Sequence, residues 1–470
     1  MNKRIIIAAA LLGLLAGCGV GPKYRKPVAQ TPAVFRGTAD PAAAADPNSL
    51  ADLKWFEVFK DERLQELIRR ALAQNFDLRE AVVRVEAARA NLGITRSDQF
   101  PQFGASAEMT TLRNSTSGQV SLPPGTSRDR TFGTVLLNLL SFELDIWGRL
   151  RKATEASRAD LLATEENRKA VVTTLVGDVA TAYFNLLDLD QELEIAKRTL
   201  ATREESLRLI RVRQQGGVAT ILDVRQAEQL VYSAAQTIPD TERSIEQTEN
   251  QISLLLGQNP GDVVRGRRLT EQEQPPAVPP GLPSSLLTRR PDIQAAEQSL
   301  IAATADIGVA RAAYFPQISL TGIAGFQSSQ LSNMFRGPGS YWNFGPQITQ
   351  PIFTAGRIKS GVRLAKAQQQ LALVEYERTI QTGFREVSDA LVGYRKVKDV
   401  RAAQESLVTT LQDRSRLAYL RYRGGVDTLL NALDSDRDLF DAELNLTRTR
   451  RDELAALVQL YKALGGGWQQ

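Results

Sequence analysis

The chain has 470 residues and a formal net charge of +5, and its 58 lysines and arginines are interspersed with 53 aspartates and glutamates. This weakly basic, mixed surface indicates no nucleic-acid partner. The complete absence of histidine excludes imidazole acid–base chemistry and histidine metal sites, and the single cysteine, Cys18, excludes disulfides within the chain and CxxC metal sites. No motif suggests carboxylate- or lysine-based catalysis, so we expect no enzyme activity, no cofactor and no metal.

Residues 1–17 have the layout of a cleaved export signal. Two basic residues precede an apolar run from Ile5 to Ala16, which is too short to span a bilayer as a mature helix. Leu15-Ala16-Gly17-Cys18 resembles the lipobox of bacterial lipoproteins, in which the cysteine becomes the acylated first residue. Gly19 in place of aspartate implies, by the same resemblance, sorting to the outer membrane. The alternative is an ordinary signal peptide with an incidental cysteine.

The next segments change from tether to helix and then to strand. Residues 18–54 are rich in proline and alanine and are expected to form an extended tether. Apolar residues at helical spacing predict helices over 55–101. In 102–146 apolar and small polar residues alternate, which predicts two strands with unlike faces, Phe103–Thr110 and Thr131–Asp145.

A long helical hairpin is predicted over 147–257. Residues 148–213 contain no proline and one internal glycine, Gly177, so they predict a single helix about 100 Å long. A helix of that length needs a packed partner. Gly216-Gly217-Val218 then reverses the chain, because glycine adopts the positive φ that other residues resist. The return helix carries apolar and threonine residues at 3–4 spacing, which indicates a packed seam.

The chain repeats itself. Arg213–Leu222 matches Arg421–Leu430 at six of ten positions, 208 residues apart, so Gly424-Gly425-Val426 is a second reversal. We therefore predict a tandem duplication of the whole arrangement. Its remaining parts are a proline-rich linker over 258–288, a helix over 289–316, two strands over 317–353, a hairpin over 354–465 and a tail over 466–470. Pro346 and Pro351 are expected at a sheet edge, a bulge or a strand end.

In this order, the motifs resemble the TolC-like outer membrane factor family, in particular its NodT-like lipoprotein branch serving RND-type efflux pumps. The resemblance covers the chain from Cys18 to about Leu464. The motifs that carry it are Arg289-Arg290-Pro291-Asp292-Ile293, Ala295-Ala296-Glu297, Ile307-Gly308-Val309-Ala310, Phe315-Pro316, Phe142-Glu143-Leu144-Asp145-Ile146-Trp147-Gly148-Arg149, and Tyr422-Arg423-Gly424-Gly425-Val426 followed by Leu433-Asp434.

The resemblance implies a mainly α-helical fold with a β-barrel part. In such a homotrimer each chain gives four strands to a shared twelve-stranded outer-membrane barrel and two long hairpins to a periplasmic α-barrel tunnel. Elementary physics supports sharing, since four strands cannot close a barrel and open edges in lipid leave backbone groups unpaired. The implied mechanism is passive conduction. The implied partners are outer-membrane lipid, a periplasmic adaptor and an inner-membrane pump, most simply of the RND type.

The family also implies functional positions at the hairpin tips. The residues of the two turns are expected to dock the adaptor: Gly216, Gly217, Val218, Gly424, Gly425 and Val426. A periplasmic gate is expected at Leu430 and Asp434, with Arg421 as a candidate ion-pair partner. The first-half counterparts are Leu222 and Gln226, so the acidic charge belongs only to the second hairpin. The alternatives are a solvated Asp434, next to Asp436 and Asp438, and ordinary hairpin packing of Leu430.

Other functions remain open at this point. Within the same class, the tunnel could serve as the exit duct of a type I secretion system. A periplasmic adaptor is also an exported lipoprotein, but it has one hairpin between lipoyl-like β segments. An exported enzyme is disfavoured by the missing histidine and nucleophile motifs.

Overall fold

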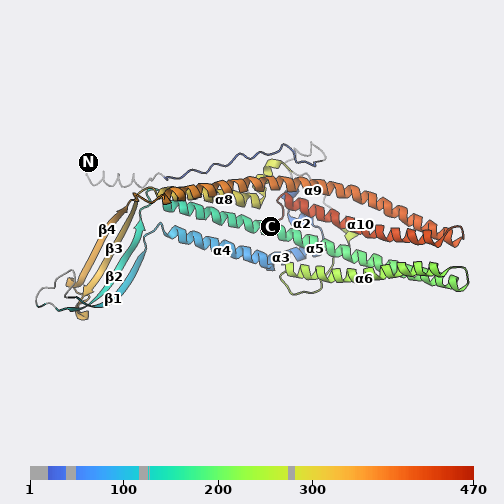
Figure 1. Cartoon of the computed structure of the whole chain (residues 1–470), viewed down its shortest axis with the longest axis horizontal. Helices are drawn as coiled ribbons and strands as arrows, with labels where there is room; N and C mark the ends of the chain where they lie inside the picture. The colour runs from blue at the N-terminus through green and yellow to red at the C-terminus, as the bar shows by residue number, and fades with distance from the viewer. Residues whose placement is uncertain (1–18, 39–48, 116–124, 126, 274–280, 470) are drawn as a thin grey trace. The chain divides into compact units, whose positions relative to one another are not determined.

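The computed structural model describes residues 19–38, 49–115, 125, 127–273 and 281–469. The predicted signal peptide and Cys18 therefore lie outside the described residues. The chain divides into two compact units, each built from several segments. Figure 1 shows the helices and strands of these segments. The first unit comprises Met1–Pro27, Val85–Ala163 and Ala296–Tyr376, and the second comprises Val28–Arg84, Thr164–Ala295 and Glu377–Gln470.

Helices dominate the described chain and a single sheet holds its strands. The helices are α2 (Trp55–Val58), α3 (Glu62–Gln74), α4 (Phe76–Ser97), α5 (Arg149–Gln215), α6 (Ile221–Leu255), α7 (Leu286–Arg289), α8 (Pro291–Ala312), α9 (Arg357–Arg423) and α10 (Leu429–Ala463). The strands are β1 (Phe103–Arg113), β2 (Asp129–Glu143), β3 (Gln317–Ser328) and β4 (Ser340–Thr349). Short 3₁₀ helices are η2 (Leu50–Asp52), η3 (Leu269–Glu271), η4 (Pro283–Ser285), η5 (Leu331–Asn333) and η6 (Gly337–Gly339).

The predicted duplication is confirmed by the helix bounds. Both α5 and α9 have 67 residues, and both α6 and α10 have 35. Adding 208 to each bound of α5 and α6 gives the bounds of α9 and α10. In the same way, α8 is α4 shifted by 215 residues. A proline-free run of 67 residues, at a rise of 1.5 Å per residue, extends for about 100 Å.

The sheet belongs to the first unit and has the order β1-β2-β3-β4, with each neighbouring pair antiparallel. β2 begins and ends two residues earlier than predicted. It ends at Glu143 because Asp145 accepts hydrogen bonds from the backbone N–H groups of Leu150 (3.1 Å) and Arg151 (2.8 Å) and so caps α5. Pro346 lies within β4, which is an outer strand of the sheet, and Pro351 lies beyond the end of β4.

The long hairpins of the second unit pack through buried apolar clusters. One cluster, near the two turns, joins α5 and α6 to α10 through Leu207, Ile210, Val224, Ala227, Leu230, Val231, Leu429 and Leu433. The predicted seam of α6 is also confirmed, since Thr241, Ile245, Thr248 and Ile252 are buried. In the described chain one helix, α5, has a window apolar enough to cross a membrane, and 67% of that window is buried. Burial between helices accounts for this apolar window.

A buried charge network joins α5 to α10. Asp188 is fully buried and accepts hydrogen bonds from Thr447 Oγ1 (3.0 Å) and Arg451 Nη1 (2.9 Å). The neighbouring Glu192 accepts from Arg448. Burial raises the pKa of Asp188 to about 6, because desolvation of the carboxylate outweighs the attraction of Arg451.

We expect this burial to make the stability of the helical unit depend on pH. Because the folded pKa of Asp188 lies above its ordinary value of 3.8, the native state binds the proton more tightly than the unfolded chain does. The resulting stabilisation is complete below about pH 4 and is lost as the pH rises through about 6, by about 3 kcal/mol in total. Asp188→Asn should therefore gain stability relative to the wild type between about pH 4 and 7. Unfolding midpoints measured across this range test the expectation, and parallel curves for the two proteins would contradict it.

Candidate functional site

The two faces of the sheet differ in polarity. Register pairs Phe103 with Leu139, Ala105 with Leu137, Leu137 with Ala324 and Ala324 with Trp342, so these side chains share one face. The opposite face is the more polar one: it carries Ser106, Glu108, Thr134, Asn138, Gln327 and Asn343, together with Phe132, Leu136, Ile323 and Tyr341. Across this polar face Asn138 Nδ2 donates to Ser106 Oγ at 3.0 Å. The alternation is typical of a strand that separates lipid from water.

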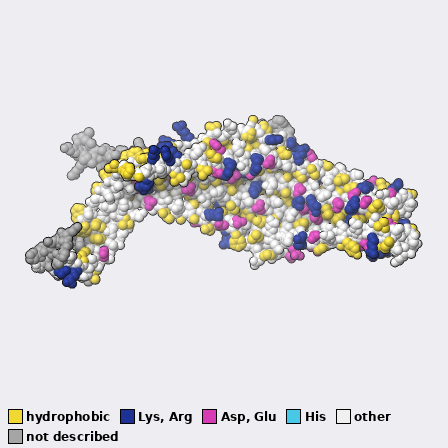
Figure 2. All heavy atoms as spheres, in the orientation of Figure 1, with side chains coloured by type: hydrophobic (Ala, Val, Ile, Leu, Met, Phe, Trp, Pro, Cys, Tyr) yellow, Lys and Arg dark blue, Asp and Glu magenta, His cyan; other side chains and the backbone are white. Residues whose placement is uncertain are grey.

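The apolar face is uncovered in the single chain. Trp342 is 76% exposed, and Phe344, Ile348, Leu137 and Met109 are exposed as well. β3 and β4 contain no charged residue. Figure 2 shows few charged side chains along the strands, whereas charges of both signs are scattered over the helices. An apolar surface of this kind needs a cover of lipid or protein.

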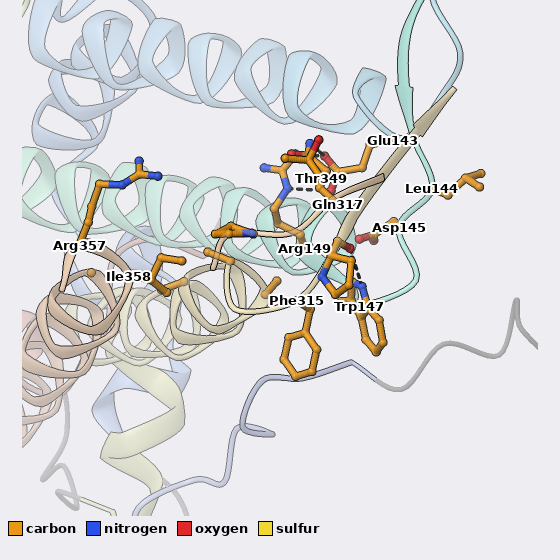
Figure 3. A pocket seen from close by; sticks show the side chains of 16 residues that line it. Glu143, Leu144, Asp145, Trp147, Arg149, Phe315, Gln317, Thr349, Arg357 and Ile358 are labelled. Atoms are coloured by element: carbon orange, nitrogen blue, oxygen red, sulfur yellow. Dashed lines mark hydrogen bonds and ion pairs between the residues drawn. The ribbon is translucent and has the colours of Figure 1, made fainter. Parts of the chain in front are cut away.

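The strands join α5 and α9 at a cavity of about 510 Å³ (Figure 3). Arg149 donates to both oxygens of Glu143, at 2.9 and 2.6 Å, and these hydrogen bonds raise the pKa of the guanidinium above its ordinary value. Gln317 at the start of β3 donates to the same carboxylate at 2.6 Å. Trp147 stacks on Phe315 with ring centroids 4.7 Å apart. The motif of residues 142–149 therefore connects the end of β2 and the start of β3 to the first turn of α5.

The two hairpin turns have the conformation that the glycine pairs predict, with one refinement. Gly217 has φ +76° and Gly425 has φ +74°, whereas Gly216 and Gly424 do not have positive φ. Only the second glycine of each pair is therefore required by the backbone. After each turn a threonine caps the return helix: Thr220 accepts from the backbone N–H of Asp223, and Thr428 accepts from that of Asn431.

Apolar side chains are exposed at both tips. Val218 and Val426 occupy equivalent positions after the glycine pairs, and both are largely exposed. Ile221 and Leu222, at the start of α6, are exposed as well. Arg213 lies over the ring of Tyr422 at 4.9 Å and so links the first hairpin to the second next to the turns.

The structure places Leu430 and Asp434 on one face of α10, one turn apart. Leu430 is 48% exposed, while its neighbours Leu429 and Leu433 are buried in the apolar cluster. The Leu430 side chain is therefore not part of the apolar packing between helices of one chain. Asp434 forms an ion pair with Arg437 at 3.2 Å on the same helix and remains partly exposed.

Within the chain Arg421 forms its ion pair with Asp427, and Asp434 forms its own with Arg437. Arg421 Nε donates to Asp427 Oδ2 at 3.0 Å, and Asn431 Nδ2 donates to the other oxygen of Asp427 at 2.6 Å. The hydrogen bonds from Asn431 and Arg421 lower the pKa of Asp427. Within one chain, therefore, the ion-pair partner of Arg421 is Asp427 in the turn, and not the predicted Asp434. Sequence reasoning missed Asp427. The available signal was the difference between the two turns, since the first turn has Ala219 at the position equivalent to Asp427.

Two further residues with a structural role were missed. Arg203 on α5 is 3% exposed and donates to Asp436 Oδ2 at 2.7 Å and to the Leu230 carbonyl at 2.9 Å. Its guanidinium also lies 4.9 Å from the ring of Phe440. Of the aspartates Asp434, Asp436 and Asp438, it is Asp436 that turns into the packed interior. The only sequence signal was that Arg203 falls at helical spacing from Leu200 and Leu207.

Known protein families and solved structures were compared with this chain, and they agree with the duplicated, two-hairpin fold described above. The family model described as outer membrane efflux protein matches residues 67–258 and 282–466. The chain belongs to the outer membrane efflux protein family. The two matched segments correspond to the two halves of the duplication and leave out most of the linker. This membership overturns the periplasmic adaptor as an alternative.

Individual members of the outer membrane efflux protein family are similar over nearly the whole chain. The toluene efflux pump outer membrane protein TtgC of Pseudomonas putida is 39% identical, with 100% of this chain and 97% of that protein covered. The cation efflux system protein CusC of Escherichia coli is 36% identical, with 97% of each covered. The open-state structure of the Neisseria gonorrhoeae MtrE outer membrane channel has a TM-score of 0.85 at 34% identity and covers 96% of this chain and 99% of that chain. The chain is an outer-membrane transport component.

Proposed function

We propose that three copies of this chain form a passive channel-tunnel across the outer membrane and into the periplasm. The observation that carries the proposal is the open, two-faced sheet, whose apolar face is uncovered and whose outer strands are β1 and β4. Pairing of β4 with β1 of a neighbouring copy would close a barrel, satisfy the backbone at both edges and turn the polar face inward. The number three follows the family resemblance.

The tunnel serves a tripartite efflux system. The hairpin tips, with exposed Val218 and Val426, offer a docking surface for a periplasmic adaptor, which connects the tunnel to an inner-membrane pump of the RND type. The naming of TtgC and CusC as parts of efflux systems supports this assignment over a type I secretion duct. Acylated Cys18 anchors the chain in the outer membrane. The chain itself conducts without catalysis or a cofactor.

Leu430 and Asp434 are proposed to line the periplasmic gate. The support is their common face on α10 and the exposure of Leu430 beside buried neighbours. In a symmetric trimer three Leu430 side chains would form an apolar constriction and three Asp434 carboxylates a charged ring. Arg421 would restrain this end by holding the turn through Asp427.

Single-channel conductance in planar bilayers tests the channel and the gate together. The purified wild type is expected to show small, intermittent openings, and Leu430→Ala/Asp434→Ala is expected to conduct several-fold more. The duplication supplies a matched control: Leu222→Ala/Gln226→Ala changes the equivalent positions of the first hairpin and should keep wild-type conductance.

The outcomes separate the claims. Equal conductance in the wild type and the Leu430→Ala/Asp434→Ala variant would discard these residues as the gate and keep the channel. Higher conductance in both double variants would show that both hairpins contribute to the gate. Folded, inserted protein without any conductance would overturn the channel itself. Transport of a polypeptide but of no small molecule by cells that carry the complete system would favour type I secretion.

A further inference from the structure

The N-terminal segment of the first unit is docked along the protein. Residues 19–27, here called the strap, contain no helix or strand, in keeping with the extended tether predicted from their composition. The strap nevertheless contacts the folded chain at three successive points, which involve Trp147 and Gly148, then Gly308, and then Glu297.

The first contact lies where β2 passes into α5. The backbone N–H of Val20 donates to the Trp147 carbonyl at 3.3 Å. A Cβ added to Gly148 would lie 3.2 Å from the Cα of Gly19, so the two backbones are close. Figure 3 shows the trace of the strap passing the labelled Trp147. Gly19 directly follows Cys18, the predicted acylation site.

The second contact is a meeting of two glycines. A Cβ on Gly21 would lie 2.7 Å from the Cα of Gly308 on α8, which is closer than side-chain carbons approach backbone atoms. Gly21 therefore accepts no larger residue unless the strap moves, whereas a Cβ at Gly308 would be a tight contact, 3.2 Å from the Cα of Gly21. Gly308 belongs to the motif Ile307-Gly308-Val309-Ala310, to which neither the channel nor the gate assigns a role.

The third contact is an ionic one. Glu297 on α8 is only 7% exposed, yet its carboxylate has no ion-pair partner on α8 among the described contacts. It accepts a hydrogen bond from Tyr24 Oη at 3.0 Å and forms an ion pair with Lys26 Nζ at 2.6 Å. Both partners come from the strap. Burying an unpaired carboxylate costs free energy. The strap therefore stabilises the ionised Glu297, and Glu297 in turn holds the strap on α8.

Glu297 and Gly308 share one face of α8. They are eleven residues apart, which is about three helical turns, so they form a track along the helix. We propose that this track is a docking site for the chain's own N-terminal segment, and that Glu297 is a positioning residue which holds the acylated end of the chain at the junction of β2 and α5. The lipid anchor and the membrane-facing sheet are thereby held in fixed relation while the sheet folds.

The proposal rests on the outer-membrane function and on acylation of Cys18, so its test avoids conductance. Trypsin can cleave the strap after Lys23 or Arg25 only when the strap leaves α8. In the full-length, membrane-extracted protein, Glu297→Ala should increase the cleavage rate about tenfold, and Glu297→Gln should have a smaller effect because it still accepts from Tyr24. Gly21→Ala should also accelerate cleavage, by displacing the strap at an independent point. Glu86→Ala, at an exposed position of α4, is the matched control and should leave cleavage unchanged.

A double-mutant cycle with Cys18→Ser distinguishes positioning of the anchor from a merely structural role. The readout is the fraction of folded, heat-modifiable protein in the outer membrane. Glu297→Ala should lower this fraction in the acylated protein and have little further effect in Cys18→Ser. Unchanged trypsin cleavage would overturn the docking role of Glu297, and equal losses in both backgrounds would overturn its role toward the anchor. The mass of the N-terminal peptide reports acylation separately, so an unacylated Cys18 is recognised as failure of the anchor assignment itself.

Discussion

Replacing Gly325 by alanine is expected to remove most of the folded protein from the outer membrane. Gly325 lies in β3 opposite Leu136 of β2. A Cβ at this position would overlap the Val135 carbonyl oxygen and lie 2.9 Å from the Leu136 Cα. These are backbone atoms of the neighbouring strand, so no side-chain rotation can relieve the overlap, and the cost should reach or exceed the ~1–3 kcal/mol typical of overpacking.

The control for Gly325→Ala is Gly104→Ala in β1. Gly104 shares the polar face of the sheet, and a Cβ there would meet only the Leu140 side chain at 3.9 Å, an ordinary contact. The measurement is the amount of heat-modifiable protein in outer-membrane fractions, which we expect to fall to roughly a tenth for Gly325→Ala and to stay near wild type for Gly104→Ala. Equal amounts of the two variants would show that β2 and β3 do not pair as described.

Arg203→Met is expected to destabilise the helical hairpins by about 3–5 kcal/mol. The substitution removes the guanidinium that binds Asp436 and the Leu230 carbonyl, and it leaves both acceptors in a packed interior. Methionine retains much of the apolar stem, so the loss reports mainly the charge and its hydrogen bonds. The measurement is the unfolding midpoint of the detergent-solubilised protein near neutral pH.

Two further variants make the Arg203 experiment specific. Arg208→Met, five residues further along α5, removes an exposed arginine that pairs with Glu205, and it should leave the unfolding midpoint close to that of the wild type. Arg203→Met/Asp436→Asn should recover part of the loss, since it also removes the unpaired carboxylate. If Arg203→Met and Arg208→Met cost the same, the buried pair does not hold the hairpins together.

The periodic features of this protein are present in its sequence. The 208-residue repeat predicted two equal hairpins, because identical glycine pairs and proline-free runs impose the same local geometry wherever they occur. Alternating polarity predicted strands with unlike faces, and one residue of slip would exchange those faces. Strand ends were less well predicted, because Asp145 left β2 to cap α5, a choice that depends on the helix that follows it.

Only the tertiary structure decided which polar side chains meet. Sequence reasoning singled out Asp434 and treated Asp436 and Asp438 as its solvated neighbours, but packing buried Asp436 against Arg203, 233 residues away. Packing likewise buried Asp188 of α5 against α10 and paired Glu297 with the strap. Helical spacing defines which residues share a face of a helix. It does not define which neighbouring helix packs on that face, or the axial register of the two helices. Those depend on contacts between segments hundreds of residues apart, which no local pattern encodes.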